Sequence, residues 1–426
     1  MAEMKAGYKQ TDIGVIPEDW GALPLDHIAR VRGGKRLPKG KALTDIANSH
    51  PYIRVLDMKN GSVDVSEIKY VPDDVFPEIK NYRIYASDLF ISVAGTLGII
   101  GRVPDVLNGA NLTENANRIC DLKINKEFLF YYLCSNKIQN HIQSMQTVGA
   151  QPKLALGRIE KFIIPTPPQE SEQKAIASAL SDVDGLIEAL SQLIAKKRDM
   201  KTAAMQQLLT GKKRLPGFDG EWQTPVLEDL ADFFKGKFLP KSAISNSGQF
   251  SCIHYGELFT HYSEKIKSIR FKTNQPINTS FLSNTNDVLM PTSDVTPNGL
   301  AKASCISQNN VILGGDILVI RPKKSTELNG VFLSYFIRFH KDEIMKRVSG
   351  TTVYHLYASD IKNLSIDLPG IEEQDAIVSV LEDMSEEIEA LEQRLAKALS
   401  LKTGMMQELL TGKTRFIKTD KKQKAA

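Results

Sequence analysis

Long apolar runs are absent from this sequence. No stretch of 18 or more apolar residues is present, as a helix would need to cross a bilayer, and the first residues lack the apolar segment of a secretory signal. The four cysteines of the 426 residues form no closely spaced pair, which excludes a disulfide framework or a cysteine-based metal site. We therefore expect a cytoplasmic protein with no membrane partner and with reduced, buried thiols.

Sequence signatures of catalysis are also missing. The glycines between Gly95 and Gly101 have the wrong spacing for a dinucleotide-binding loop, and Gln407 stands where a phosphate-binding loop ending at residues 412–414 would need its first glycine. The seven histidines show no metal-ligand spacing, and no serine or cysteine lies in a nucleophile elbow. The sequence predicts a non-catalytic chain with no catalytic residue, no metal site and no cofactor of its own.

Charge gives little information about partners. The chain carries 54 basic and 50 acidic residues, a net charge of +4, and many ordinary enzymes have a similar balance. The densest basic run follows Gly412, and we expect residues 414–426 to form a disordered basic tail.

What the sequence does contain is an internal repeat. The only two tryptophans, Trp20 and Trp222, lie 202 residues apart, and Leu37-Pro38-Lys39 recurs as Leu239-Pro240-Lys241. In the middle of each half the match is reduced to a few positions, and its offset varies, as expected when loops gain and lose residues. Two halves of common origin have therefore diverged in their central parts.

The repeat is most regular from Glu172 to Arg214, where the offset stays at 201 and more than half of the aligned positions are identical. Apolar residues recur there at alternating steps of four and three, which is typical of a helix that pairs with one other helix. Prolines precede both segments, and the sequence Leu-Leu-Thr-Gly-Lys ends both. We expect two long helices that pair antiparallel along a narrow seam. The predicted seam residues are Ile176, Leu180, Val183, Ile187, Leu190, Ile194, Ile377, Leu381, Met384, Ile388, Leu391 and Leu395.

The predicted fold class is α+β, with two pseudo-repeated mixed α/β recognition domains separated by two long antiparallel helices that form a coiled-coil spacer. The expected boundaries are 1–168 for the first domain, 169–212 for the first helix, 213–369 for the second domain, 370–413 for the second helix and 414–426 for the tail. Strand order within the domains stays open.

Polar, basic and glycine-rich segments lie at matching places in the two halves. Amides and hydroxyls can read base edges, and cations can bind phosphates, so these segments are candidates for DNA contact, although solvated surface loops have the same composition. The candidate residues are Lys35, Arg36, Lys39, Arg54, Lys59, Asn60, Thr96, Thr147, Gln151, Lys153, Lys237, Lys241, His254, Tyr255, Thr351, Thr352, Tyr354 and His355.

The chain resembles the specificity subunits of Type I restriction-modification systems, which act in defence against foreign DNA. The resemblance is carried by the opening from Tyr8 to Trp20, by the Pro-Pro-Gln-Glu-Ser-Glu-Gln-Lys-Ala-Ile segment at residues 167–176, and by the helix ends at 205–212 and 406–413. It implies that each domain is a target-recognition domain that reads one half of a bipartite, asymmetric site in double-stranded DNA, while the helices set the gap.

The resemblance also implies partners. Two modification (methyltransferase) subunits would dock on the helices, and restriction (motor-nuclease) subunits would join for cleavage. S-adenosylmethionine, ATP and magnesium would then belong to those partners. The alternative from another class is a coiled-coil protein-interaction scaffold without DNA recognition, which would show no affinity for duplex DNA and no steep salt dependence. The bases read, the gap length, the groove contacts and the oligomeric state stay open.

Overall fold

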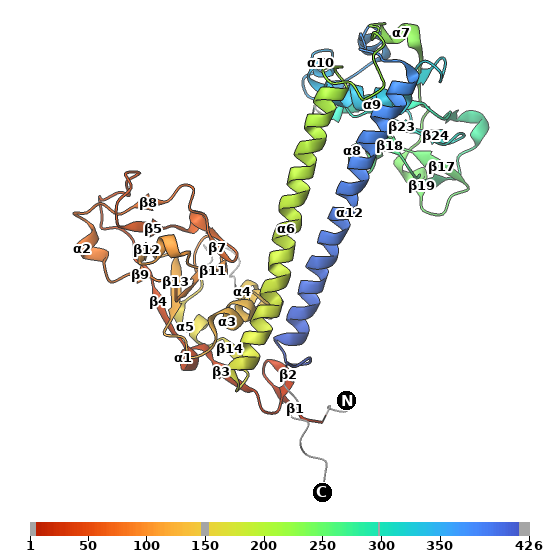
Figure 1. The fold of residues 1–426 in the computed structure, drawn as a ribbon. Coiled ribbons are helices and arrows are strands. Elements are labelled where there is room, and N and C mark those ends of the chain that lie inside the picture. Colours follow the sequence, from red (N-terminus) through yellow and green to blue (C-terminus); the bar gives the residue numbers. More distant parts are fainter. Residues whose placement is uncertain (1–5, 146–152, 297–298, 417–426) are drawn as a thin grey trace. The chain divides into compact units, whose positions relative to one another are not determined.

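The computed structural model describes residues 6–145, 153–296 and 299–416, and the chain divides into two compact units (Figure 1). Unit 1 comprises Met1–Leu190 and Arg394–Ala426, and unit 2 comprises Ser191–Gln393. Each unit contains one globular domain and a segment of both long helices. Within the described residues, no helix is both long and apolar enough to cross a membrane.

Two four-stranded sheets form the domain of unit 1. The first has the order β11-β10-β13-β4 and is antiparallel, whereas the second has the order β8-β5-β12-β9 with β5 and β12 parallel. The strands are β4 (Arg30–Gly33), β5 (Pro51–Ile53), β8 (Lys69–Tyr70), β9 (Arg83–Ile84), β10 (Leu89–Ser92), β11 (Ile100–Arg102), β12 (Ala110–Leu112) and β13 (Ala116–Cys120).

Smaller elements complete this domain. Two-stranded pairs are β1 (Tyr8–Thr11) with β2 (Gly14–Pro17), β3 (Gly21–Pro24) with β14 (Ile163–Thr166), and β6 (Met58–Lys59) with β7 (Ser62–Val63). The helices are α1 (Leu25–Ile28), η1 (Val55–Asp57), α2 (Phe76–Ile79), η2 (Asp105–Leu107), α3 (Lys126–Leu133), α4 (Asn136–Ser144) and α5 (Leu156–Glu160).

Unit 2 repeats this topology. Its sheets have the orders β15-β25-β21-β23-β18 and β16-β19-β17-β24-β20, each with one strand more than in unit 1; β17 and β24 are again the central parallel pair, and the edge strand β18 is parallel to β23. The strands are β15 (Ala231–Lys235), β16 (Ile244–Ser245), β17 (Phe250–Ile253), β18 (Lys265–Ile266), β19 (Phe271–Thr273), β20 (Phe281–Leu282), β21 (Val288–Pro291), β22 (Ser293–Asp294), β23 (Ser304–Ile306), β24 (Ile312–Leu313), β25 (Ile317–Pro322) and β26 (Tyr354–His355). The helices are α7 (Leu227–Leu230), η3 (Lys241–Ala243), α8 (Tyr255–Thr260), η4 (Ile277–Thr279), α9 (Gly330–Phe339), α10 (Lys341–Met345) and α11 (Ala358–Ile361).

The central strands explain why the repeat persists where sequence identity is low. Strand β10 is buried along its whole length, as is its counterpart β21, and both sequences are predominantly apolar, with Ser92 as the polar exception in β10. Both strands begin just after a buried aspartate, Asp88 or Asp287, which faces an arginine on the neighbouring strand, Arg118 or Arg321. Each domain therefore has a buried central strand that an aspartate–arginine ion pair joins to its neighbour.

The two long helices are α6 (Glu170–Leu208) and α12 (Ile371–Leu409). In unit 1, the beginning of α6 shares an apolar core with the end of α12, and the Lys402 ammonium lies 2.6 Å from the Asp184 carboxylate. In unit 2, the end of α6 shares a core with the beginning of α12, and Lys197 lies 2.6 Å from Glu387. The helices therefore run antiparallel within each unit, as predicted. All of the predicted seam residues are buried except Ile187, Met384 and Leu395, which are half-buried.

A three-residue cluster closes the helix pair in each unit, and we call it the terminal clasp. In unit 1 it consists of Trp20, Glu172 and Arg415: the Arg415 guanidinium donates to both Glu172 carboxylate oxygens at 2.8 Å, and the Trp20 indole donates to the same carboxylate at 3.3 Å. In unit 2 the equivalent residues are Trp222, Glu373 and Arg214, with both Arg214 contacts at 2.6 Å.

The clasps explain the repeated Thr-Gly-Lys-x-Arg sequence. Gly211 and Gly412 end their helices at φ values of +65° and +70°, in the left-handed region that favours glycine, and this turn directs the following arginine to the first turn of the other long helix. The expectation of a disordered tail therefore fails at Arg415, because two carboxylates, Glu172 and Asp19, bind its guanidinium. Residues 417–426 lie outside the described part of the chain.

Candidate nucleic-acid interface

A capped turn follows the central parallel strand in each domain, and the two turns contain three of the candidate residues: Arg54, His254 and Tyr255. After β5, the Arg54 backbone N–H donates to the Asp57 carboxylate at 2.8 Å, and its guanidinium binds both oxygens of that carboxylate. After β17, the His254 N–H donates to the Glu257 carboxylate at 3.4 Å in the same arrangement. Arg54 and His254 are therefore structurally equivalent, and each has a side chain held by its own turn.

The two capped turns differ in electrostatics. In unit 2, burial raises the pKa of the Glu257 carboxyl to about 7 and lowers the pKa of the His254 imidazole. The Tyr255 ring packs against the His254 ring with centroids 4.4 Å apart. In unit 1, the hydrogen bond from Arg54 to Asp57 raises the pKa of the guanidinium. Near pH 7, one turn therefore presents a charged pair, whereas the other presents a neutral imidazole beside a carboxyl that is about half ionised.

A basic loop follows β4 in unit 1 and β15 in unit 2, and the two loops contain five further candidates. Its backbone is fixed, since Lys35 N–H donates to Leu112 C=O at 2.8 Å in unit 1 and Lys237 N–H donates to Leu313 C=O at 3.1 Å in unit 2. Its side chains are exposed. Arg36 forms an ion pair with Glu114 at 2.8 Å, whereas Lys39, Lys237 and Lys241 form no ion pair within the described residues. These three ammonium groups are free to bind phosphates.

A returning segment in each domain contains the remaining described candidates. Lys153 forms a β-bridge with Ala94, and the equivalent strand β26, which consists of Tyr354 and His355, pairs with β22. The His355 Nδ1 atom lies 3.1 Å from the Ser293 hydroxyl. The remaining candidates are exposed threonines: Thr96 lies two residues after Ala94, and Thr351 and Thr352 lie just before β26. Thr147 and Gln151 lie outside the described residues.

All three segments converge on the turn that follows the parallel strand pair, residues 113–115 in unit 1 and 314–316 in unit 2, which we call the central turn. In unit 2, Gly314 N–H donates to Ile253 C=O at 2.9 Å, and Thr292 N–H donates to Asp316 C=O at 3.0 Å. A β-carbon at Gly314 would lie 3.5 Å from the His254 Cα atom. The basic loop also bonds here, because Lys237 forms a bridge with Gly314.

Unit 1 repeats this convergence with different residues. Thr113 N–H donates to Ile53 C=O at 3.1 Å, which joins the central turn to the capped turn. Val93 N–H donates to Asn115 C=O at 2.7 Å, and Val93 C=O accepts from Leu154 N–H at 2.9 Å, so Val93 links the central turn to the returning segment. A β-carbon at Gly34 would lie 2.0 Å from the Thr113 carbonyl oxygen, so the basic loop passes directly over the same turn. Each domain thus gathers its candidate residues around one backbone framework.

Two candidates do not belong to this cluster. Lys59 and Asn60 lie at the β6–β7 hairpin, where Lys59 is paired with Asp64 at 2.6 Å. Asn60 instead lines a cavity together with Arg102, Tyr131 and Asp184, next to the long helices. These two residues lie apart from the central turn of their own domain.

Sequence reasoning missed Phe238, which is the most exposed aromatic side chain of the basic loop in unit 2, at 79% exposure. It occupies the position of Arg36 in the repeat, between Lys237 and the buried Leu239. An apolar residue at the site of a charged repeat partner was the signal that could have identified it. Elsewhere in the described residues, no group of histidine, cysteine and acidic side chains is arranged to hold a metal ion.

Comparison with known proteins gives consistent matches. A family model described as the Type I restriction modification DNA specificity domain matches residues 17–196 and again residues 219–400. The putative type I restriction enzyme MjaX specificity subunit of Methanocaldococcus jannaschii is 26% identical over 96% of both chains. The type I restriction enzyme EcoBI specificity subunit of Escherichia coli is 21% identical over 46% of this chain and 43% of its own length.

Solved structures have a similar fold. The S subunit of a Type I restriction-modification system from M. genitalium matches with a TM-score of 0.58 and 15% identity, over 95% of this chain and 99% of that chain. A chain from a structural study of complex assembly in the type I restriction-modification system matches with a TM-score of 0.56 and 18% identity, over 94% and 99%. The match of one family model to both halves confirms the predicted repeat.

Proposed function

This chain belongs to the family of Type I restriction-modification DNA specificity proteins, and we propose that each of its central turns presents the residues that read one half of a bipartite DNA site. The predicted specificity subunit is confirmed by the family match, and the scaffold without DNA recognition has no support. The chain is the non-catalytic, sequence-reading component.

One observation carries the proposal for the reading sites. Both domains place a capped turn, a basic loop and a returning segment around the same backbone turn, yet the side chains at equivalent positions differ in chemistry. Arg54 is replaced by His254, and Arg36 by Phe238. Two frameworks of one geometry with unlike side chains will read two unlike half-sites, so the full site is asymmetric.

The roles within each reading site follow from exposure. The free ammonium groups of Lys39, Lys237 and Lys241 would bind phosphates and fix the register of the protein on the duplex. The side chains of the capped turn and the returning segment, among them His254, Tyr354 and His355, offer hydrogen-bond donors and acceptors to base edges. Because the capped turn and the returning segment hold their backbone in place, they would present these groups at little cost in conformational entropy.

The paired helices would set the gap and bind the partner subunits. Both helices expose several large apolar side chains, which a partner subunit could bury. These residues are Leu186, Leu193, Met200, Leu399 and Leu401. We propose that methyltransferase subunits cover this surface, that restriction subunits join the resulting complex, and that S-adenosylmethionine, ATP and magnesium bind to those partners.

Domain exchange tests the proposal. Residues 1–165 are replaced with those of a relative that has a different specificity, the complex with the methyltransferase subunits is assembled, and its methylated sites are mapped. We expect one half-site to change and the other to stay as it was. The reciprocal exchange of residues 213–369 is the matched control and should change only the other half-site. A change of both half-sites in either chimera contradicts the proposal.

A further inference from the structure

The basic loop of unit 2 exposes an apolar ring where the repeat has a charge. Phe238 is 79% exposed, although both of its neighbours in the chain are fixed. The Lys237 N–H donates to Leu313 C=O at 3.1 Å on one side, and the Leu239 side chain is buried in the domain core on the other. The loop therefore holds the Phe238 backbone in a defined place while the ring meets water.

Two coordinated replacements between the units accompany this exposure. In unit 1 the equivalent pair is Arg36 and Glu114, whose side chains form an ion pair at 2.8 Å. In unit 2 Glu114 is replaced by Gly315, and a β-carbon at Gly315 would lie 3.5 Å from the Phe238 Cα atom. Gly315 therefore lies beside the Phe238 backbone without a side chain to cover the ring.

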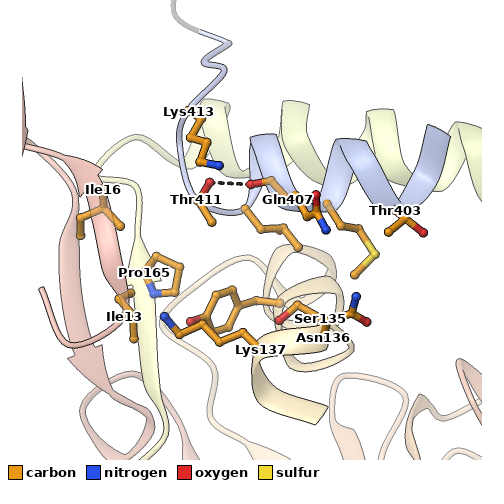
Figure 2. Close-up of a pocket in the computed structure, with 13 residues that line it drawn as sticks. Ile13, Ile16, Ser135, Asn136, Lys137, Pro165, Thr403, Gln407, Thr411 and Lys413 are labelled. Atoms are coloured by element: carbon orange, nitrogen blue, oxygen red, sulfur yellow. Dashed lines mark hydrogen bonds between the residues drawn. The ribbon is translucent and has the colours of Figure 1, made fainter. Parts of the chain in front are cut away.

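Another apolar surface of the protein is shielded by the chain itself. In unit 1, a cavity of about 240 Å³ lies next to the end of α12, and Figure 2 shows apolar side chains on the side opposite to that helix. Among them are Ile13, Ile16 and Pro165. Phe238 differs, because most of its surface is exposed and a partner molecule is needed to remove its ring from water.

The groups around the exposed ring suit a DNA partner. The free ammonium groups of Lys237 and Lys241 belong to residues one position before and three positions after it. A β-carbon at Gly314 would lie 3.5 Å from the His254 Cα atom and 3.7 Å from the Leu239 Cβ atom, so the basic loop and the capped turn approach each other here. Phosphate contacts by the lysines would direct the ring to the groove that the capped turn faces.

A phenyl ring can select one group among those that base pairs present. It has no hydrogen-bond donor or acceptor for the amino, carbonyl and ring-nitrogen groups of the base edges. The thymine 5-methyl group is the apolar group on these edges, it lies in the major groove, and a phenylalanine side chain can contact it. This contact removes apolar surface of both partners from water, which favours binding.

We propose that Phe238 is a specificity-determining residue of unit 2 and that its ring contacts the 5-methyl group of one thymine. The proposal rests on the function proposed above, since it assigns one base-pair position to a domain that reads DNA. The basic loop of unit 2 then lies at the major groove, with Lys237 and Lys241 on the flanking phosphates. The corresponding position in unit 1 is the charged Arg36, so this contact belongs to one half-site only.

Removal of single methyl groups from the DNA tests this proposal. The full chain is assembled with its methyltransferase subunits, and the half-site of unit 2 is identified by exchange of residues 213–369. Each thymine of that half-site, on either strand, is then replaced in turn by deoxyuridine, which lacks only the 5-methyl group. At one position we expect deoxyuridine to weaken binding about fourfold, which corresponds to one buried methyl group.

Three variants connect this effect to the ring. Phe238→Ala should abolish the difference between thymine and deoxyuridine at that position, and Phe238→Leu, which keeps an apolar side chain, should retain part of it. Leu56→Ala is the matched control, because it removes an apolar side chain of unit 1 that is 86% exposed, and it should leave the difference unchanged. Since Phe238 is exposed, unfolding of unit 2, followed by Trp222 fluorescence, should be the same in Phe238→Ala and its parent.

Several results would overturn the proposal. These are a unit 2 half-site without an A·T pair, equal binding of all the deoxyuridine duplexes, and a deoxyuridine effect that persists in Phe238→Ala. If Phe238→Ala weakens binding to thymine and deoxyuridine duplexes equally, the ring inserts between base pairs instead of contacting a methyl group. Failure of the proposed function is recognised separately, because exchange of residues 213–369 would then leave both half-sites unchanged.

Discussion

The terminal clasp of unit 1 gives a sharp prediction, because its carboxylate is almost fully buried. The Glu172 side chain is 2% exposed, and the Arg415 side chain that neutralises it is 18% exposed. Arg415→Ala leaves this carboxylate with the Trp20 indole N–H, at 3.3 Å, as its side-chain hydrogen-bond partner within the described residues. Removing one partner of a buried ion pair costs about 3 to 5 kcal/mol, and we expect about 3 kcal/mol here because Arg415 is partly solvated.

The two tryptophans allow the effect to be measured in one unit at a time. In a Trp222→Phe background, fluorescence during denaturant unfolding reports on Trp20 and therefore on unit 1; in a Trp20→Phe background, it reports on unit 2. Arg415→Ala should lower the free energy of unfolding of unit 1 and leave unit 2 unchanged. Adding Glu172→Gln to Arg415→Ala should recover part of the loss, since the amide carries no buried charge.

The same variant should alter the acid response of unit 1. The hydrogen bond from Arg415 lowers the pKa of Asp19 below its ordinary value of 3.8. A lowered folded-state pKa contributes stability above pH 3.8 that is lost as the pH falls through the folded-state value. The difference in the free energy of unfolding of unit 1 between Arg415→Ala and its parent should therefore become smaller as the pH falls below 3.8. Equal losses in both units, or no loss in unit 1, would refute the reasoning.

Three further changes test other parts of the structure. Burial raises the pKa of Glu257 from 4.5 to about 7, so the free energy of unfolding of unit 2 should fall by about 3 kcal/mol as the pH rises between these values. Glu257→Gln should flatten this pH dependence, measured by the Trp222 fluorescence during unfolding. Gly412→Ala should destabilise unit 1 by at least about 1 kcal/mol more than Gly211→Ala destabilises unit 2. Both glycines have positive φ, but only the β-carbon at residue 412 would lie 2.5 Å from a neighbouring proline, Pro17. A larger loss for Gly211→Ala would contradict this account. For the assembled methyltransferase, the double variant Lys237→Ala and Lys241→Ala should lower the slope of log K for DNA binding against log[salt] by about 2 and leave both half-sites unchanged. An altered half-site would assign these lysines to base reading instead.

The sequence predicted the parts of this fold that periodicity controls. The heptad spacing from Ile176 to Ile194 predicted the seam, and the repeat of the Leu-Leu-Thr-Gly-Lys segment predicted where both helices end. These features depend on local propensity and on one apolar stripe, which a single sequence displays directly.

Pairing across long sequence separations could not be predicted in this way. The parallel pairing of β5 with β12 joins residues about 60 positions apart, and only the folded chain brings the basic loop, the capped turn and the central turn together. The role of Arg415 was also missed, because its partner Glu172 lies 243 residues away. The offset of 201 between Glu172 and Glu373, and between Arg214 and Arg415, was the available signal for both clasps.

The central claim is that the helix pair fixes the separation of two unlike half-sites, and a change in helix length tests it most directly. One heptad is inserted after Leu190 in α6 and one after Leu391 in α12, so that the seam keeps its phase and each helix grows by about 10 Å. Methylated sites of the assembled complex are then mapped by single-molecule sequencing. We predict both half-sites unchanged and the gap longer by about 3 base pairs, at about 3.4 Å per base pair; an unchanged gap, or a change in either half-site, would contradict the claim.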